Sequence, residues 1–346
     1  MSMKAAVYLG NGSMAVQSVP IPQPGADEVL VKVSGCGVCA TDVHIFNGFA
    51  EGVKPPVALG HEIGGVIEKL GEGAGEFQVG TKVAIDPTVT CGTCEYCLSG
   101  RNSLCEQPTI IGYSRWGGFA QYCVAPKTHV YPMSDQASVG AGVLAETLAC
   151  VLTGFDRLNM TPSSNVLLVG AGTVGLLWNN LVKNLIGASL VQVELVQKRA
   201  ERAKRVGADA VHIVGTGETD RDFLNIYKDG FDIVVDCAGT GKSVQFGLDR
   251  VSRGGVFLCF GVCDESDTVT FSPLRLLWNE INILTAKMTG GNLGRAVKLV
   301  ESDVIAVDQI VTSSYGLEDV VDCLGRFKSH RESEVKMVID PYLQRK

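Results

Sequence analysis

Long apolar runs and dense basic runs are both absent from this chain. No stretch reaches the roughly 18 to 20 consecutive apolar residues that a membrane-spanning helix needs, which argues against a membrane protein. No cluster of Lys and Arg stands out, and the formal net charge of −7 argues against nucleic acid as a partner. The first residues, Met1 to Lys4, lack the pattern of a secretory signal and lead directly into a strand-like run. We therefore expect a cytoplasmic protein that binds neither a membrane nor a nucleic acid.

Charged residues are also few, at 19% of the chain against 46% hydrophobic residues, and this balance indicates a packed globular protein. A length of 346 residues exceeds what one ordinary core supports and suggests two domains. The twelve cysteines would suggest disulfides in a small secreted protein, but metal ligation fits a chain of this size better. Cys36 and Cys39 form a CxxC pair, for which a redox role is an alternative, although no thioredoxin-like context surrounds it.

An imidazole and a carboxylate stand side by side at His61-Glu62, in a glycine-flanked apolar segment. The segment from Cys39 to His44 adds a thiol, a hydroxyl, a second carboxylate and a second imidazole. A thiolate, an imidazole and a carboxylate can hold a zinc ion and leave one coordination position open for substrate or water. Because single His and Cys residues are more often part of a core, this motif alone leaves both interpretations open. A second metal-type cluster and a dinucleotide motif in the same chain favour a catalytic metal.

Four cysteines follow one another closely, at Cys91, Cys94, Cys97 and Cys105, on a stretch rich in small and polar residues. Four thiolates at this spacing can close a tetrahedron around zinc without an open position, so the cluster predicts a structural zinc. An iron–sulfur cluster is the alternative. The ferredoxin run that also begins CxxCxxC ends with a three-residue spacer and Pro, however, whereas seven residues separate Cys97 from Cys105 here.

A dinucleotide-binding motif follows a turn at 161–165. The apolar strand 166–169 leads into Gly170-x-Gly172-x-x-Gly175 and a helix predicted over 176–186, the context that this fingerprint requires. The next strand ends in Glu194, where a carboxylate would bind the adenosine ribose and repel the 2′-phosphate of NADP, although Lys198 and Arg199 could accept that phosphate. Predicted helices at 198–206, 220–228 and 243–251 then alternate with strands at 210–214, 231–236, 256–260 and 281–284, which indicates a doubly wound parallel sheet.

These motifs resemble the zinc-containing medium-chain dehydrogenase/reductase family, which includes the alcohol and polyol dehydrogenases, and the resemblance spans nearly the whole chain. It implies an α/β protein with a GroES-like, β-rich catalytic domain at 1–152 and 287–346 and a Rossmann NAD-binding domain at 153–286. It also implies one catalytic zinc, one structural zinc, NAD as the cofactor and a homodimer or homotetramer.

The resemblance assigns roles to individual residues. Cys39 and His61 match zinc ligands, and Glu62 and Glu146 match carboxylates at the ion. Glu146 stands where polyol dehydrogenases have Glu and alcohol dehydrogenases have Cys, although the following residue replaces the proline usual in the polyol branch. Thr41 and His44 match the hydroxyl and the base of the family's proton relay. The residues matched to cofactor binding are Gly170, Gly172, Thr173, Val174, Gly175, Glu194 and Arg199.

The expected function is an NAD-dependent zinc enzyme that transfers hydride between a secondary alcohol or polyol and NAD, with the ketone as product. Alternatives are a dehydrogenase for a sugar-alcohol phosphate or for threonine, and a non-catalytic nucleotide-binding protein on the same fold. Polyol dehydrogenases commonly bind substrate hydroxyls with an Arg-Tyr pair. The corresponding stretch, 279–288, contains no arginine, and Lys287 is the substitute it offers, so the substrate stays open between these classes.

Overall fold

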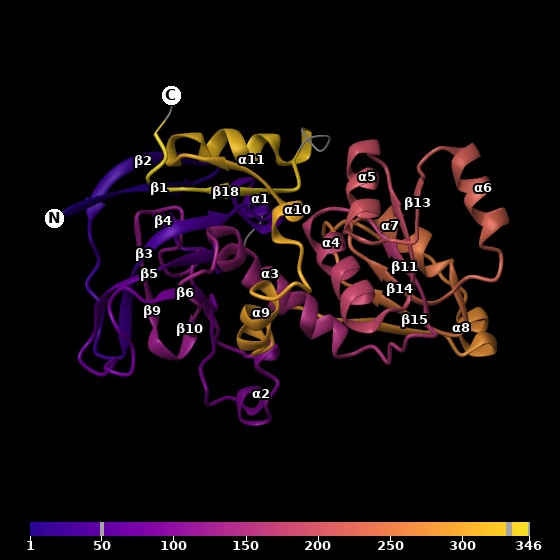
Figure 1. Cartoon of the computed structure of the whole chain (residues 1–346), viewed down its shortest axis with the longest axis horizontal. Coiled ribbons are helices and arrows are strands. Elements are labelled where there is room, and N and C mark those ends of the chain that lie inside the picture. The colour runs from indigo at the N-terminus through magenta and orange to yellow at the C-terminus, as the bar shows by residue number, and fades with distance from the viewer. Residues whose placement is uncertain (49–51, 330–333, 345–346) are drawn as a thin grey trace. The chain divides into compact units, whose positions relative to one another are not determined.

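The computed structural model describes residues 1–48, 52–329 and 334–344 (Figure 1). The chain divides into two compact units, and it leaves the first unit and later returns to it. Among the described residues, no helix combines the length and the apolar character that crossing a bilayer requires. The first unit comprises Met1–Ala149, Met288–Asp303 and Val311–Lys346, and the second comprises Cys150–Lys287 and Val304–Ile310.

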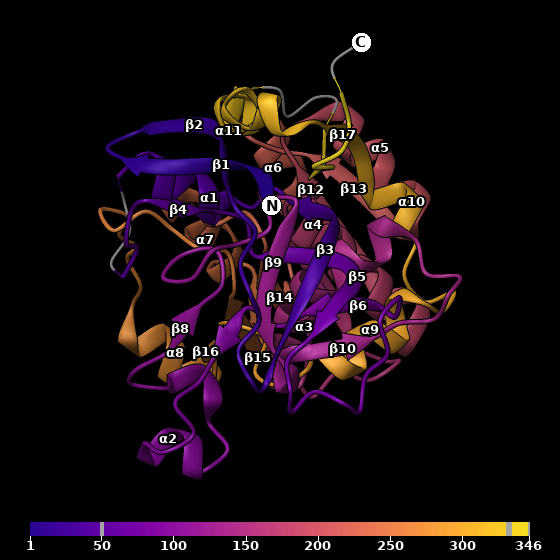
Figure 2. The ribbon, with the colours of Figure 1, turned by 90° about the vertical axis from the view of Figure 1, so that its left-hand side faces the viewer.

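The first unit is built on largely antiparallel sheet. Its larger sheet has the order β10-β6-β5-β3-β18-β17, with β9 also paired to β3, and the smaller sheet has the order β2-β1-β4. Figure 2 shows β1 and β2 alongside each other. The strands are β1 (Ser2–Gly10), β2 (Ser13–Pro20), β3 (Glu28–Gly37), β4 (Val57–Ala58), β5 (Glu62–Leu70), β6 (Lys82–Ile85), β9 (Tyr122–Pro126), β10 (Val130–Pro132), β17 (Val311–Tyr315) and β18 (Lys336–Ile339), and a separate pair is formed by β7 (Thr88–Val89) and β8 (Thr109–Ile110).

Strands β3 and β5 carry the core of this unit and place the candidate site. Val29, Val31 and Val33 alternate along β3 and share a core with Ile63 and Ile67 of β5. The two strands pair antiparallel, so the end of β3 lies beside the start of β5. The helical segments of this unit are α1 (Ala40–Phe46), α2 (Glu95–Leu98), η1 (Asn102–Leu104), η2 (Lys127–His129), α9 (Leu293–Val300), η4 (Leu317–Asp319) and α11 (Val320–Ser329), and α3 (Val139–Phe155) continues from this unit into the second.

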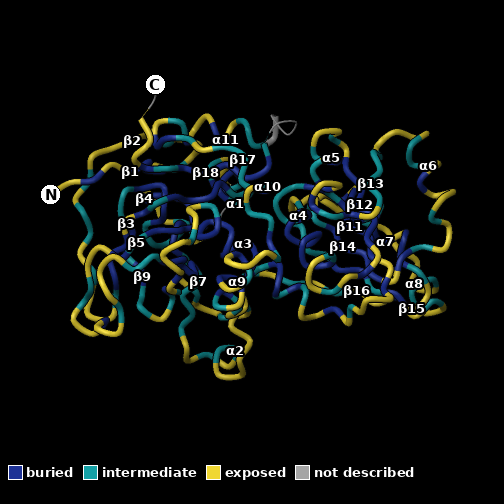
Figure 3. The backbone as a smooth tube through the Cα atoms, in the orientation of Figure 1, coloured by how far each residue is buried: buried dark blue, intermediate teal, exposed yellow. Residues whose placement is uncertain are grey.

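The second unit is a parallel sheet in the order β13-β12-β11-β14-β15-β16. Strands β11, β12 and β14 are mostly buried in Figure 3, whereas the helices α5 and α6 carry exposed faces. The chain reverses its direction of travel across the sheet at β11, and such a switch point is where α/β sheets bind ligands. The elements are β11 (Asn165–Val169), α4 (Thr173–Asn180), η3 (Leu181–Ile186), β12 (Ser189–Glu194), α5 (Gln197–Val206), β13 (Ala210–Ile213), α6 (Gly217–Ile226), β14 (Phe231–Asp236), α7 (Gly241–Leu248), β15 (Val251–Cys259), α8 (Pro273–Asn279), β16 (Asn282–Thr285) and α10 (Val307–Ile310).

Three helix predictions need correction, and the first is the helix predicted over 220–228, which runs instead from Gly217 to Ile226 because Thr216 caps it. The helix predicted over 176–186 begins earlier, at Thr173, and its last part is a π-helical segment, where the Asn180 side chain donates 2.7 Å to the Leu176 carbonyl and disturbs the regular ladder. The helix predicted over 243–251 is shifted toward the N-terminus. Thr240 caps it by accepting a hydrogen bond from the Ser243 backbone, and the helix ends at Leu248. Residue 251 is β-branched and instead opens β15.

Candidate active site

Cys39 and His61 come from two segments that one buried carboxylate holds together. Cys39 is the N-cap of α1, and the Asp42 side chain accepts a hydrogen bond of 2.9 Å from the Cys39 N–H. The same carboxylate accepts a hydrogen bond of 3.2 Å from the Gly60 N–H, and its Oδ1 lies 3.5 Å from the Nδ1 of His61. Asp42 is fully buried, and sequence reasoning gave it no role. The sequence signal that could have identified Asp42 is its position three residues after the N-cap Cys39, where a carboxylate commonly accepts a hydrogen bond from the N–H of the cap residue.

Ligand atoms of Cys39, His61 and Glu62 lie within 4.8 Å of one another. Ligand atoms of one tetrahedral zinc, bound at about 2.0 to 2.3 Å, are about 3.3 to 3.8 Å apart, so this sulfur, nitrogen and oxygen set would hold zinc after the side chains close in by at most about 1.5 Å. The buried Nδ1 of His61 has no hydrogen-bond partner, because the 3.5 Å to Asp42 is too long for an ordinary hydrogen bond. Burial lowers the pKa of His61, but the neighbouring Tyr113, Asp42 and Cys39 outweigh it and raise that pKa well above its usual value.

Both oxygens of the Glu62 carboxylate are bound by a lysine that the sequence did not reveal. Lys336 Nζ donates 2.7 and 2.6 Å to the two Glu62 oxygens, and the Thr147 hydroxyl donates 2.9 Å to one of them. Both members of the ion pair are buried. Burial lowers the pKa of Lys336, but the neighbouring Glu62 and Cys39 oppose it, and the net shift is upward. Lys336 therefore holds its charge next to Glu62.

The other predicted residues of this site lie around the three-residue cluster. Thr41 and His44 are on α1, with Thr41 Oγ1 3.6 Å from Cys39 Sγ. Glu146 is buried on α3 and raises the pKa of Lys336, but among the described residues it is not part of the group within 4.8 Å. The structure thus brings Cys39, His61 and Glu62 together, and Glu146 lies outside this group of described residues.

A tyrosine adds a further hydroxyl that was not predicted. The ring of Tyr113 meets the imidazole of His61 edge-on, with centroids 5.5 Å apart at 81°. Burial raises the pKa of Tyr113 above its usual value. Its loop is held by backbone contact. A Cβ on Gly112 would lie 2.8 Å from the Gly60 carbonyl oxygen, and one on Gly117 would collide with the same oxygen.

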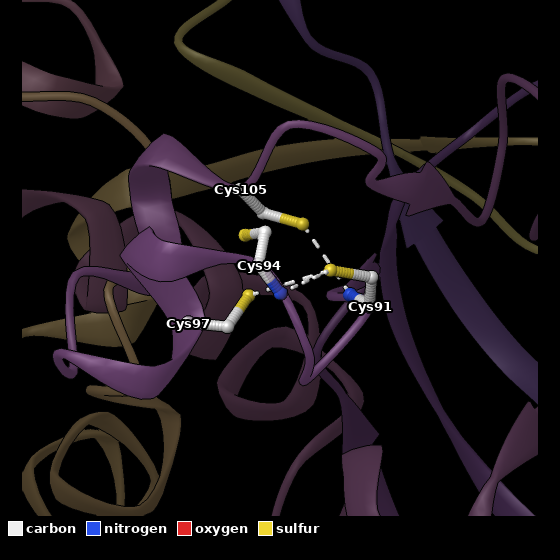
Figure 4. Close-up of side chains that lie close together, drawn as sticks. All are labelled: Cys91, Cys94, Cys97 and Cys105. Carbon is white, nitrogen blue, oxygen red and sulfur yellow. Dashed lines mark hydrogen bonds between the residues drawn. The ribbon is translucent and has the colours of Figure 1, made fainter.

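The four-cysteine cluster, shown in Figure 4, lies on residues 91–105, which include α2 and η1 and are called the four-cysteine lobe below. The ligand atoms of Cys91, Cys94, Cys97 and Cys105 are within 4.8 Å of one another. The N–H of Cys91 donates 3.3 Å to Cys105 Sγ, and the N–H of Cys94 donates 3.4 Å to Cys91 Sγ. Backbone N–H groups of Thr93 and Cys94 lower the pKa of Cys91 to about 6, which favours the thiolate that a metal binds. The arrangement fits a closed tetrahedral zinc site.

The glycine-rich turn has the geometry that a dinucleotide needs. Gly170 has a φ of 105°, and a Cβ on Gly175 would collide with the Gly170 carbonyl, so neither position accepts a side chain. A Cβ on Gly172 would meet only the Arg199 guanidinium, at 3.8 Å, which leaves the backbone open to a close approach. Gly172 is the N-cap of α4, and Thr173 and Val174 form its first turn, so their N–H groups offer a site for a pyrophosphate.

Glu194 stands at the end of β12, as predicted, and backbone N–H groups fix it. Its Oε2 accepts a hydrogen bond of 2.7 Å from the Ala171 N–H. Its Oε1 accepts hydrogen bonds of 2.7 Å from the Leu195 N–H and 3.1 Å from the Val196 N–H. The carboxylate is therefore held against the glycine-rich turn. Arg199 lies on α5, with its guanidinium near Gly172.

Two family models match the chain in the order found in the structure. Residues 25–135 match the alcohol dehydrogenase GroES-like domain, and residues 173–302 match the zinc-binding dehydrogenase family. Sorbitol dehydrogenase of Bacillus subtilis (strain 168) is 29% identical over 98% of both chains. D-arabinitol dehydrogenase 1 of Uromyces fabae is 32% identical over 95% of both chains.

The fold is shared as well. The structure of a candidate zinc-binding dehydrogenase of Sinorhizobium meliloti 1021, bound to NADP, matches with a TM-score of 0.91 and 29% identity, over 99% of this chain and 100% of the other. The expected GroES-like and Rossmann domains are confirmed. On the sequence, the fold and the cysteine, histidine and glutamate cluster together, this chain belongs to the zinc-containing medium-chain dehydrogenase family.

Proposed function

We propose that this chain oxidises the secondary alcohol of a polyol to a ketone with NAD⁺, and catalyses the reverse reduction. The observation that carries the proposal is the meeting of Cys39, His61 and Glu62 at one point of the first unit, with a dinucleotide turn in the second. The sorbitol and arabinitol dehydrogenases among its relatives support the polyol. In this proposal residues 1–152 and 287–346 bind zinc and substrate, and residues 153–286 bind NAD.

The proposed catalytic zinc would be held by Cys39 and His61, with Glu62 as the nearest carboxylate and Glu146 as the alternative. When bound, zinc supplies Lewis acidity that lowers the pKa of a substrate hydroxyl, and NAD⁺ accepts the hydride. The residues of the chain hold this arrangement: Asp42 fixes the Cys39 and Gly60 backbones, and Lys336 fixes Glu62. The second zinc, at Cys91, Cys94, Cys97 and Cys105, would stabilise its lobe.

The proposed proton path begins at Thr41. Thr41 and His44 are three residues apart on α1 and therefore lie on the same helix face. A hydroxyl can accept a proton through one lone pair while it passes its own proton to the next group. An imidazole takes up a proton near neutral pH. We assign Thr41 to the substrate hydroxyl and His44 to the final acceptor.

We infer that NAD is preferred because Glu194 is a fixed carboxylate at the ribose position. Glu194→Gln should therefore lower the ratio of kcat/KM with NAD⁺ to kcat/KM with NADP⁺. A hydrogen bond to a charged group contributes about 1.5 to 3 kcal/mol, so the ratio should fall roughly 10- to 100-fold. Arg199 is then available to a 2′-phosphate. The measurement is initial rates with both cofactors and the same alcohol.

The ratio is insensitive to a general loss of stability, since both cofactors are tested on one variant. Glu201→Gln is a matched control, because Glu201 is an exposed residue of α5 whose carboxylate accepts a hydrogen bond from the side chain of Gln197. It should leave the ratio unchanged. A wild-type enzyme that prefers NADP⁺, or a Glu194→Gln ratio within about twofold of wild type, would contradict the inference.

We also infer a homodimer or homotetramer in the cytoplasm. Strand β16 is at the edge of the parallel sheet. The same region exposes large apolar side chains, which a second copy pairing along that edge would cover. They are Phe271, Leu274, Leu277, Trp278 and Ile283. The twelve cysteines form no disulfide, as is usual in a reducing compartment.

The test of the proposed function is the zinc content per chain, together with NADH formation across polyols, polyol phosphates, simple secondary alcohols and threonine. We expect two zinc ions and the highest activity with polyols. Highest activity with a phosphorylated polyol or with threonine would reassign the substrate. Two zinc ions or fewer with no turnover of any alcohol would favour a non-catalytic nucleotide-binding protein and contradict the proposal.

A further inference from the structure

One peptide group of the glycine-rich turn is bound on both sides by side chains of β12. Its carbonyl, that of Gly170, accepts a hydrogen bond of 2.8 Å from Gln192 Nε2. Its N–H, that of Ala171, donates a hydrogen bond of 2.7 Å to Glu194 Oε2. Because Gln192 and Glu194 are two residues apart in one strand, their side chains lie on the same face of the sheet. This face of β12 therefore holds a single planar peptide with an amide and a carboxylate.

The peptide requires this support because glycine does not fix its own orientation. Gly170 has a φ of 105°, a conformation that side-chain-bearing residues rarely adopt, and glycine changes its dihedral angles at little steric cost. The space for the supporting amide comes from Gly175. A Cβ at that position would collide with the Gly170 oxygen and would lie 3.1 Å from Gln192 Nε2. The third glycine of the fingerprint thus makes room for the Gln192 side chain to reach the first.

A second buried amide determines which end of the Gln192 side chain faces the turn. Asn179 of α4 donates from Nδ2 a hydrogen bond of 2.8 Å to Gln192 Oε1 and one of 2.9 Å to the Ala203 carbonyl of α5. The Ala203 carbonyl can only accept, so the NH₂ group of Asn179 must face it. The oxygen of Gln192 then receives the other Asn179 hydrogen, and the NH₂ group of Gln192 is directed to Gly170.

These two amides are an expensive way to fill this part of the core. Gln192 and Asn179 are fully buried, whereas Leu190, Val191 and Val193 of the same strand are the apolar residues expected in a buried sheet. The buried Oδ1 of Asn179 has no hydrogen-bond partner among the residues that the structure describes. An unpaired buried oxygen destabilises the folded state, and apolar side chains of the same shape would avoid that cost. The amides are better explained by the peptide that they hold.

We propose that Gln192, oriented by Asn179, is a positioning residue for the dinucleotide. It holds the peptide between Gly170 and Ala171 and, through the Ala171 N–H, the Glu194 carboxylate. The proposal rests on the proposed function, in which the turn binds the pyrophosphate and Glu194 binds the adenosine ribose. Gln192 acts on the affinity for the adenosine half of the cofactor and has no part in hydride transfer.

The experiment measures the affinity of wild type and Gln192→Met for NADH and for ADP-ribose, which lacks the nicotinamide. Methionine is similar in length and adapts to irregular spaces, but it has no hydrogen to donate to the Gly170 carbonyl. Fluorescence titration with NADH, and displacement of NADH by ADP-ribose, give the two dissociation constants. We expect both to rise about tenfold, which corresponds to about 1.4 kcal/mol. In zinc-loaded enzyme with the best polyol, the KM for NAD⁺ should rise while kcat does not fall.

Asn179→Leu is a second variant, which keeps Gln192 but removes the group that orients it. It should raise both dissociation constants about threefold. The matched control is Asn180→Ala. Asn180 is also a fully buried amide of α4, but it donates 2.7 Å to the Leu176 carbonyl and accepts 3.0 Å from the Ala306 N–H, both outside the turn. Its replacement should lower the unfolding midpoint and leave both dissociation constants within about twofold of wild type.

The inference is overturned if Gln192→Met and Asn179→Leu both keep the two dissociation constants within twofold, or if Asn180→Ala weakens binding as much as they do. It is also overturned if NADH binds more weakly while ADP-ribose does not. A wild-type protein that binds NADH but oxidises no alcohol would contradict the proposed function alone, and the binding data would still decide on Gln192. A wild-type protein that binds no NADH would overturn both.

Discussion

Cys39→Ser is expected to lower kcat/KM with the best alcohol by about 1,000-fold or more. A Lewis-acidic ion contributes several kcal/mol to the transition state, and each 1.36 kcal/mol is tenfold in rate. Serine is a preferred N-cap residue, so α1 should keep its start and the protein its fold. The measurement is steady-state kinetics together with elemental analysis, which should show one zinc per chain in place of two.

Cys323→Ala is the control for this experiment. Cys323 is also a cysteine of the first unit, but it is buried in α11 and belongs to the core shared with β3 and β5. Its replacement should keep both zinc ions and most of the activity. Unchanged activity in Cys39→Ser would overturn the assignment of the catalytic site. The same holds if the variant loses the zinc of the four-cysteine lobe and keeps the zinc at Cys39 and His61.

Lys336→Met is expected to lower the unfolding midpoint of the metal-free protein by roughly 6 to 20 °C. Removing one partner of a buried ion pair costs about 3 to 5 kcal/mol, because the remaining charge is left without compensation. For a unit of about 200 residues, each 1 kcal/mol moves the midpoint by about 2 to 4 °C. The Glu62 carboxylate would keep the hydrogen bond from the Thr147 hydroxyl but lose both from Lys336. Differential scanning calorimetry, with and without added zinc, measures the effect.

Lys4→Met is the matched control, since Lys4 also pairs with a glutamate of the same unit, at 2.9 Å, but on the surface. Exposed pairs contribute about 1 kcal/mol or less, so its midpoint should barely move. The double variant Glu62→Gln/Lys336→Met removes both charges and should regain most of the lost stability. Equal shifts for Lys336→Met and Lys4→Met would show that the buried pair has no special weight.

The part of the site that sequence could predict is the part encoded locally. Cys39, Thr41 and His44 are spaced along one short helix, and His61-Glu62 are adjacent. The register between β3 and β5 then brings the two segments together, and that register follows from the alternation of apolar residues that the sequence does show. Their roles in zinc binding and proton transfer remain predictions until they are tested.

The part that sequence could not predict depends on pairing across the chain. Lys336 stands 274 positions from Glu62, in a strand whose pattern gives no reason for a buried lysine. The position of Tyr113 follows from the glycine contacts of its loop with Gly60, which no local pattern reveals. Helix α8 is a different case: it was not predicted, although Ser272 and Pro273 mark its start locally and the helix has no buried residue.

The glycines that flank Tyr113 fix the backbone of its loop. Gly112 and Gly117 rest with their backbones on Gly60, next to His61, and neither tolerates a Cβ. The loop between them is therefore clamped at both ends, and its frame does not depend on the side chain at position 113. A new residue at position 113 would therefore change the side chain that packs edge-on against His61, while the backbone that carries it stays in place.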